Sequence, residues 1–444
     1  MDDADDLLAL ASATPTASAR AHCAECRVPI LPGPPTPEEL AALAAAGLPA
    51  IFSGCIEHWP ALRRWSHAYL REALGEREVH VAVTADGLAD AVVPLDEPGS
   101  PRHDEQHNER SNHERQHERH DERHDERVRH DDRFVFAKPY EQPVPYSSFL
   151  DALESPSTPP NGMPRAIYYA SHQCSSLTSE FGPLWGDVEL SLPWADAAFG
   201  TKPEAVNFWQ GEDRARTTVH ADLYDNLYAV VRGVKEFSLL PPQEGVRLKR
   251  RRFRAATAVR AAADGGAPRG GGESGRRSEG AGCEGAILAA ELRIELDEPR
   301  QFVWWASPEL QEPEGLKELG MEAPEGTEHH RGDAPAIRAT VRRGQMLFLP
   351  ALWWHAVGQR AADDAADETA ADDAADHAAD DAADDLTASD VESVAASRDS
   401  DPSTLAVNYW YEGPVARGDA AGAAAERAAE RVLETVCGGV SSCR

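Results

Sequence analysis

The sequence contains no hydrophobic run long enough to cross a membrane, and it begins MDDADD where a secretory leader would carry basic residues. Its seven cysteines are odd in number and irregularly spaced, so they do not form a disulfide framework. Cys23 and Cys26 have the spacing of half a zinc site, but no second pair follows nearby. We therefore expect reduced, structural thiols in a cytoplasmic protein that makes no membrane contact.

Basic residues are also in short supply. Lys and Arg number 44 against 76 Asp and Glu, which gives a formal charge of −32 and argues against nucleic-acid binding. Much of this excess is local, because Ala361–Asp401 holds fifteen acidic residues against one Arg. The cluster RLKRRRFR, which begins at Arg247, leaves nuclear import open. However, the alternation that continues from this cluster to Arg260 favours a barrel strand.

Three segments lack the large apolar residues that a core needs. They are the His/Glu/Asp/Arg run 101–132, the Gly/Ser/Arg-rich run 260–286 and the Ala/Asp tract 359–403. We expect solvated inserts, with an acidic recruitment surface as the alternative for the last. The remaining length suits one barrel. The domains expected are a flexible arm 1–35, a helix and strand region 36–170, a barrel 171–415, and a C-terminal helix 416–444 that could cap the barrel or form a homodimer.

The N-terminal region carries clear local signals. Thr36 is expected to cap a helix that ends before Gly47, because Pro and two Glu fill its first turn. Apolar runs and alternation predict strands in LPAIFSG, EVHVAVTADG, FVFA and AIYYA, and helices in HWPALRRW and from Tyr146 to Leu153. Trp59 and Trp65 are expected in the core.

The stretch Val206–Pro242 contains the chemistry. His220 and Asp222 are two residues apart in a segment that alternates like a strand, so both side chains can reach one metal ion. His355, in LFLPALWWHAV, would supply a third ligand. The spacing alone is weak evidence, because His130 and Asp132 repeat it within a low-complexity run. Two imidazoles and one carboxylate form a facial triad suited to non-haem Fe(II).

The same stretch predicts an anion site. Alternation breaks at Arg232-Gly233 and then resumes, which predicts a hairpin with Val230 opposite Lys235. Lys235 would then share an interior face with Tyr228, Val230, Phe237 and Leu239. A buried ammonium is costly unless it meets an anion. The stretch therefore predicts a metal and an anion inside one β-barrel.

The blocks VNFWQG, TTVHADLYDNLYAVVRGVKEFSLLPP, TVRRGQMLFLPALWWHAV and LAVNYWYEG resemble the JmjC (cupin-like) 2-oxoglutarate oxygenases. The likeness covers most of the chain outside the three inserts. It implies a mainly β fold, a double-stranded β-helix or jelly-roll barrel with N-terminal and C-terminal helices. It also implies Fe(II) at His220, Asp222 and His355, with 2-oxoglutarate and dioxygen at the open positions of the metal.

The resemblance further implies which side chains hold 2-oxoglutarate. Lys235 would meet its far carboxylate, with help from Thr217 and Tyr169. In a regular strand Thr217 points away from the side of His220, so either the strand bulges or Thr218 takes the role. For Tyr169, a plain core role remains the alternative. Two further positions match the family beside the co-substrate, Asn226 and Asn408.

The likeness is strongest to lysyl hydroxylases of this family. It implies C-3 hydroxylation of lysine in a protein substrate, with developmentally regulated GTP-binding proteins as partners. One alternative keeps the enzyme but makes it a lysine demethylase or a hydroxylase of another residue. A second alternative is a non-catalytic cupin-like binding module, whose charged inserts would be the working surfaces.

Overall fold

The computed structural model describes residues 19, 21–23, 26–95, 133–155, 164–261, 287, 289–318, 335–361 and 401–412. The predicted C-terminal helix 416–444 and nearly all of the three low-complexity segments lie outside these ranges. Among the described residues, no helix combines the length and the apolar character needed to span a membrane.

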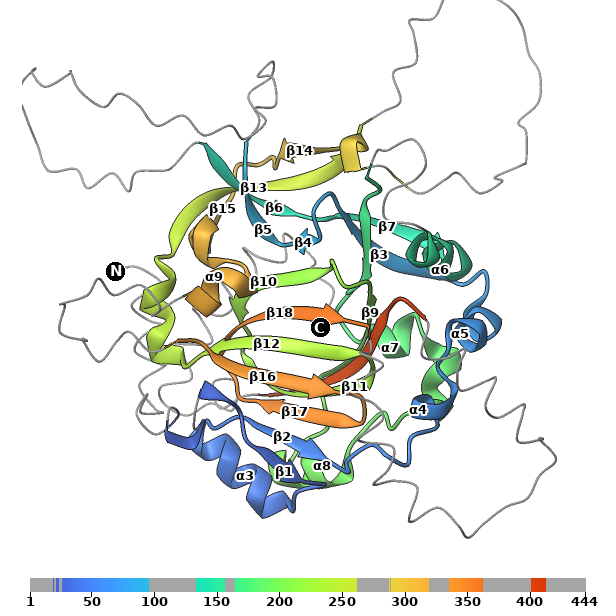
Figure 1. Ribbon diagram of the computed structural model, residues 1–444, viewed down its shortest axis with the longest axis vertical. Helices are drawn as coiled ribbons and strands as arrows, with labels where there is room; N and C mark the ends of the chain where they lie inside the picture. Colours follow the sequence, from blue (N-terminus) through green and yellow to red (C-terminus); the bar gives the residue numbers. More distant parts are fainter. Residues whose placement is uncertain are drawn as a thin grey trace, which may run out of the picture.

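Two sheets face each other and form the barrel that the sequence predicts (Figure 1). The nine-stranded sheet has the order β1-β2-β17-β11-β19-β9-β8-β3-β7. The barrel sheet has five strands in the order β16-β12-β18-β10-β4. Their bounds are β1 Ile30–Pro32, β2 Ala50–Ser53, β3 Glu78–Thr84, β4 Leu88–Ala89, β7 Tyr140–Pro145, β8 Ile167–Ala170, β9 Ala205–Gly211, β10 Arg216–Ala221, β11 Tyr224–Arg232, β12 Val234–Leu240, β16 Ile337–Arg342, β17 Gln345–Leu349, β18 Trp354–Arg360 and β19 Thr404–Glu412.

A third sheet, called here the outer sheet, lies beyond β4 at the top of Figure 1. It contains β5 Ala91–Pro94, β6 Phe134–Lys138, β13 Arg251–Arg260, β14 Leu292–Leu296 and β15 Phe302–Trp305. The strand predicted near Arg251–Arg260 therefore exists, but its expected place in the barrel is wrong. Its partners are β6, β14 and β15, none of which belongs to the barrel.

The longer helices lie outside the barrel, as Figure 1 shows for α3, α5 and α6. The helices are α3 Pro37–Ala46, α4 Pro60–Arg64, α5 His67–Leu74, α6 Tyr146–Glu154, α7 Ser176–Ser179, α8 Pro193–Phe199 and α9 Pro313–Glu318. The predicted first helix is confirmed with both ends. The Thr36 side chain accepts a hydrogen bond from the Glu39 amide, and Gly47 takes the left-handed conformation with φ +61°.

Two apolar cores lie on opposite faces of the nine-stranded sheet. The outer core lies between this sheet and the helices. It contains strand side chains such as Phe52 and Val81, and also Trp59 and Trp65 as predicted. The inner core lies between this sheet and the barrel sheet, and it contains Tyr169 and Tyr228. Successive strand residues alternate between these cores because strand side chains alternate in direction. The inner core is where the predicted ligands must meet.

The predicted hairpin at Arg232-Gly233 is wrong. β11 pairs with β17 and β19, whereas β12 pairs with β16 and β18, so the chain passes from one sheet to the other at Gly233. Gly233 has φ +71°, and an added Cβ would lie 2.7 Å from the carbonyl oxygen of Arg360. Alternation cannot distinguish a hairpin from such a crossing, since both keep one face inward. The inward face was predicted correctly, and Lys235 is 1% exposed.

Two predicted boundaries do not match the packing. The end of the expected arm 1–35 is ordered against the barrel, because Val28 is buried and β1 pairs in parallel with β2. The division at residue 170 also falls within one sheet, since β8 pairs with both β3 and β9. The region 36–170 is therefore part of the same body as the barrel.

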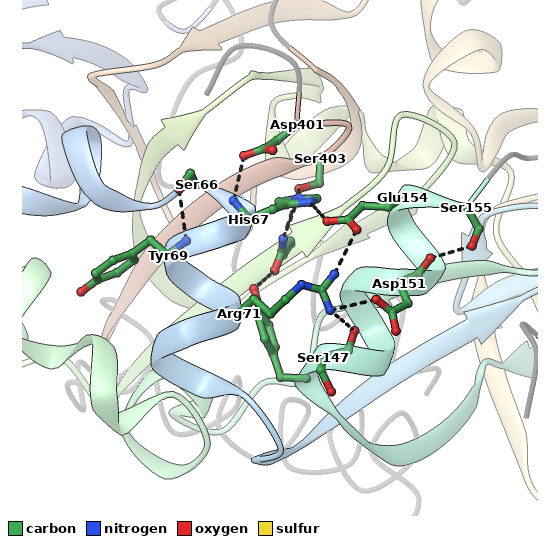
Figure 2. A network of polar contacts seen from close by, with 12 residues as sticks. Ser66, His67, Tyr69, Arg71, Ser147, Asp151, Glu154, Ser155, Asp401 and Ser403 are labelled. Atoms are coloured by element: carbon green, nitrogen blue, oxygen red, sulfur yellow. Dashed lines mark hydrogen bonds and ion pairs between the residues drawn. The ribbon is translucent and has the colours of Figure 1, made fainter. Parts of the chain in front are cut away.

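The predicted insert 359–403 is too long at both ends. Gln359 lies within β18, and the return of the chain is held by a buried polar network (Figure 2). In this network the His67 ring lies 2.7 Å from Ser403 Oγ and 2.9 Å from Glu154 Oε1. The His67 amide donates to Asp401 Oδ2 at 2.8 Å. These contacts fix the chain just before β19 begins.

Candidate metal centre

The three predicted metal ligands come together at one end of the barrel sheet. His220 near the end of β10 lies directly opposite His355 in β18, and Asp222 follows β10 by one residue. The His220 Nε2 atom is 3.8 Å from Asp222 Oδ1, and the His355 Nε2 atom is 3.7 Å from Asp222 Oδ2. One ligand atom from each residue lies within 4.8 Å of the other two. This spacing allows the three groups to share one ion.

Backbone carbonyls fix the orientation of both imidazoles. His220 Nδ1 lies 2.8 Å from the Thr218 carbonyl oxygen, and His355 Nδ1 lies 2.9 Å from the Trp353 carbonyl oxygen. A carbonyl only accepts hydrogen bonds, so each Nδ1 carries the proton and each Nε2 presents its lone pair toward Asp222. Burial and the neighbouring His220 lower the pKa of His355 to about 4. His355 is thus a neutral ligand at physiological pH.

The donor set fits Fe(II). Two imidazoles and a carboxylate, each from β10, its end or β18, leave part of a coordination sphere open on one side. The look-alike pair His130 and Asp132 lies outside the described residues. No sulfur ligand takes part, and this set of nitrogen and oxygen donors suits a redox-active divalent ion that must also bind substrates.

A buried cation lies farther along the same strands. Lys235 in β12 is paired with Gln359 in β18, while Leu239 is paired with His355 four residues away. Strand residues four apart share a face, and they are about 13 Å apart along the strand. Lys235 Nζ donates to Tyr169 Oη at 3.1 Å and to Gln359 Oε1. The lysine therefore faces the same interior as the metal ligands.

The environment of Lys235 contains only neutral partners within the described residues. Its ammonium lies 5.1 Å from the Tyr169 ring centre and 5.9 Å from that of Tyr228. Burial lowers the pKa of Lys235 to about 7. A buried amine that pairs with neutral groups but with no carboxylate is suited to an incoming anion.

Thr217 and Thr218 have different surroundings because of the fold of β10. The register shifts between Thr217 and His220, which is the bulge that Thr217 required. A hydrogen bond from Thr217 contributes to the pKa of Tyr169, although burial raises that pKa overall. Thr218 instead donates to the Asp90 carbonyl oxygen at 2.5 Å. Thr217 is therefore the threonine that lies against Tyr169, which bonds to Lys235.

The two neighbouring tyrosines of β8, Tyr168 and Tyr169, lie in different cores. Tyr168 belongs to the outer core, and its hydroxyl accepts a hydrogen bond from the Ile287 amide at 2.8 Å. Tyr169 belongs to the inner core and bonds to Lys235. Tyr169 consequently lies where the sequence placed it.

Asn226 and Asn408 form a buried chain of hydrogen bonds. The Asn408 side-chain amide donates to Asn226 Oδ1 at 3.0 Å, and Asn408 Oδ1 accepts from Trp209 Nε1 at 2.8 Å. The two asparagines lie on neighbouring strands, β11 and β19, of the nine-stranded sheet. They brace the sheet that faces the metal ligands.

Gln359 was not predicted as a site residue, because it was expected to lie in the insert 359–403. Its signal was present, because it follows His355 by four residues and so shares its face if β18 continues. Gln359 Nε2 also donates to the Glu212 carbonyl oxygen at 2.7 Å. A Cβ added to Gly211 would lie 2.6 Å from the Tyr169 ring and 2.7 Å from Gln359 Nε2. Glycine at this position leaves room for both side chains.

The profile of the cupin-like domain family matches residues 35–417, which is most of the chain and includes every site residue above. The chain belongs to this family. The cupin-like chain is 32% identical over 344 residues to the human bifunctional peptidase and (3S)-lysyl hydroxylase JMJD7, covering 77% of this chain and 84% of that protein.

Two further relatives carry different names. JmjC domain-containing protein E of Dictyostelium discoideum is 29% identical, with coverage of 70% of this chain and 73% of the relative. Lysine-specific demethylase JMJ32 of Arabidopsis thaliana is also 29% identical, with coverage of 71% and 72%. Family membership, these relatives and the donor set make the cupin-like chain a 2-oxoglutarate-dependent dioxygenase that uses Fe(II).

Proposed function

We propose that this dioxygenase adds one oxygen atom to a lysine side chain of a protein substrate, at C-3. The observation that carries the proposal is the pairing of a facial triad with a buried lysine on one interior face. The 32% identical relative is named a (3S)-lysyl hydroxylase. Together these support a hydroxylase over a binding module, which needs neither a metal triad nor a buried ammonium.

Each site residue has a proposed task. His220, Asp222 and His355 would hold Fe(II), which supplies the redox chemistry that couples dioxygen and 2-oxoglutarate to oxidation of a C–H bond. The two carbonyl contacts keep both imidazoles in the metal-binding tautomer. Lys235 would bind the far carboxylate of 2-oxoglutarate.

The tasks of the remaining residues are to orient this co-substrate and to keep water out. Tyr169 and Thr217 would donate hydroxyl hydrogen bonds beside the carboxylate that Lys235 binds. The pair Asn226 and Asn408 would hold the adjoining wall in position. Apolar residues of the inner core surround them and limit access of water.

A lysine substrate also needs a partner for its ammonium, and Asp90 is the candidate. The residue keeps some exposure, but its carboxyl group is desolvated, and burial together with Glu141 raises its pKa to about 6 while His220 lowers it. Asp90 is held beside β10 by the hydrogen bond from Thr218 to its carbonyl oxygen. An acidic group within electrostatic reach of a metal ligand suits an unmodified lysine, which has three N–H donors.

Mass spectrometry of peptide products tests the reaction. Unmethylated lysine peptides incubated with protein, Fe(II) and 2-oxoglutarate should gain one oxygen atom on a side-chain carbon. The Asp222→Ala protein should give none, and Asp90→Asn should raise KM for the peptide more than it lowers kcat. If methyl-lysine peptides release formaldehyde while unmethylated ones gain no oxygen, the demethylase alternative holds. The 29% identical relative named a lysine-specific demethylase keeps that alternative in the test.

For partners, we propose developmentally regulated GTP-binding proteins as the substrates, in the cytoplasm with the nucleus as the second location. The resemblance to lysyl hydroxylases supports these substrates, and the odd, irregularly spaced cysteines support a reducing cytoplasm. Lysine peptides from these GTP-binding proteins should react faster than shuffled peptides of the same composition; equal rates would remove the assignment. A homodimer through 416–444 would appear as a doubled mass by light scattering, lost on truncation at 415.

A further inference from the structure

A second cluster of metal-binding side chains lies apart from the triad and shares no residue with it. It consists of His80 in β3, His172 two residues after β8 and Glu180 directly after α7. One ligand atom from each lies within 4.8 Å of the other two, as in the triad. His80 Nδ1 is 3.4 Å from Glu180 Oε1, and His172 Nδ1 contacts the same oxygen. The two imidazole centres are 4.9 Å apart.

The carboxylate is held in place by the backbone. The His80 amide donates to Glu180 Oε2 at 2.6 Å, which leaves Oε1 facing both imidazoles. Glu180 is 9% exposed, whereas the side chains of His80 and His172 are 48% and 37% exposed. A desolvated, oriented carboxylate with two imidazoles open to solvent has the form of a three-ligand site that takes water or another donor as the fourth ligand.

The cluster has a defined place relative to the metal centre. His80 and Ala82 are two residues apart in β3 and share one face of the nine-stranded sheet. Ala82 lies directly opposite Tyr169 in the pairing of β3 with β8, so His80 is on the inner face as well. An ion there would tie β3 to the segment that links β8, which carries Tyr169, to α7. The cluster is thus built on the same sheet surface as the co-substrate site.

We propose that His80, His172 and Glu180 form a second metal site that binds Zn(II). Two nitrogens and one oxygen in a compact group match the ligands that zinc takes, and an imidazole–carboxylate set with an open position favours it over Ca(II) or Mg(II). Without metal, the Glu180 carboxylate contacts both imidazoles, so the three groups already lie together before an ion binds.

The test uses Co(II) as a spectroscopic substitute for Zn(II), in full-length protein carrying Asp222→Ala so that the triad is disabled. Adding His172→Ala should remove one equivalent of bound metal and the visible absorption of four-coordinate Co(II). His58→Ala is the matched control, since His58 also pairs with a glutamate, at 3.2 Å from Glu189, but has no third ligand among the residues that the structure describes. All of these proteins keep the histidine-rich run 101–132. Any metal that this run binds therefore contributes equally to each protein.

A second measurement guards against misfolding. Zn(II) should raise the melting temperature of the Asp222→Ala protein, and His80→Ala or His172→Ala should abolish the increase while leaving the metal-free melting temperature within a few degrees. Glu180→Gln should weaken Co(II) binding at least tenfold while retaining the fold. Equal metal stoichiometry and identical Co(II) spectra with and without His172→Ala would overturn the proposal.

Discussion

The affinity for 2-oxoglutarate should fall as pH rises, because Lys235 must be protonated to bind a carboxylate. Burial lowers the pKa of the free lysine to about 7, and a bound carboxylate would raise it again. Below pH 7 the ammonium is already present; above it, each binding event must first take up a proton. The dissociation constant then varies inversely with the protonated fraction of the free lysine, and it should rise about 25-fold from pH 6.5 to pH 8.5. Both carboxylates of 2-oxoglutarate stay ionised throughout this range.

Isothermal titration of Mn(II)-loaded protein in oxygen-free buffers measures this directly. Buffers of different ionisation enthalpy should reveal uptake of about one proton at pH 8.5 and almost none at pH 6. Lys235→Arg keeps a charge at every pH, so its profile should be flat. Lys235→Ala should bind roughly ten- to a hundredfold more weakly at pH 6.5, again without a slope, while holding Mn(II) normally. A flat wild-type profile with no proton uptake would refute a lysine anion site.

Three further outcomes are expected. His220→Ala should lose bound Fe(II) and all 2-oxoglutarate turnover while His130→Ala, in the look-alike pair, keeps both; the reverse result would place the metal centre elsewhere. Replacing residues 365–397 with a short Gly-Ser linker should leave soluble protein with normal turnover, and aggregation of this variant would show that the tract packs on the body. Burial lowers the pKa of His67, so the unfolded chain binds its proton first and stability should fall as pH drops through about 6.5. Chemical denaturation should show a shallower decline for His67→Gln, and parallel curves would remove His67 as the cause.

Part of the site was predictable from local signals, and the family resemblance supplied the rest. His220 and Asp222 lie two residues apart, and Lys235 is an ammonium within an apolar alternation, so side-chain direction alone placed all three inward. For Thr217, which the resemblance named, side-chain direction left two alternatives, a bulge or a role for Thr218, and β10 has an irregular register at this point. Alternation carries this information because it reports which face is buried.

Strand partners were not predictable in the same way. Nothing in the alternation around Gly233 states whether the next strand joins the same sheet or the facing one, and that choice depends on contacts with β16 to β19 far along the chain. The extent of β18 was missed for a related reason. Gln359 is polar and stands next to a low-complexity tract, and only its pairing with Lys235 shows that it belongs to the strand. Burial of polar residues is decided by partners that composition does not reveal.

The two ends of the chain that flank residues 362–400 are held in place by contacts that do not involve that segment. The Ala361 amide donates to Asp213 Oδ1 at 2.6 Å, Thr404 Oγ1 donates to the Arg360 carbonyl oxygen at 3.1 Å, and Arg232 pairs with Asp401. With the ends fixed, doubling the length of the connection would cost only about 0.6 kcal/mol of closure entropy. Duplication of an alanine- and aspartate-coding repeat at this position would therefore be nearly invisible to selection for folding. A change in the length of this tract would therefore leave the contacts between the flanking strands in place.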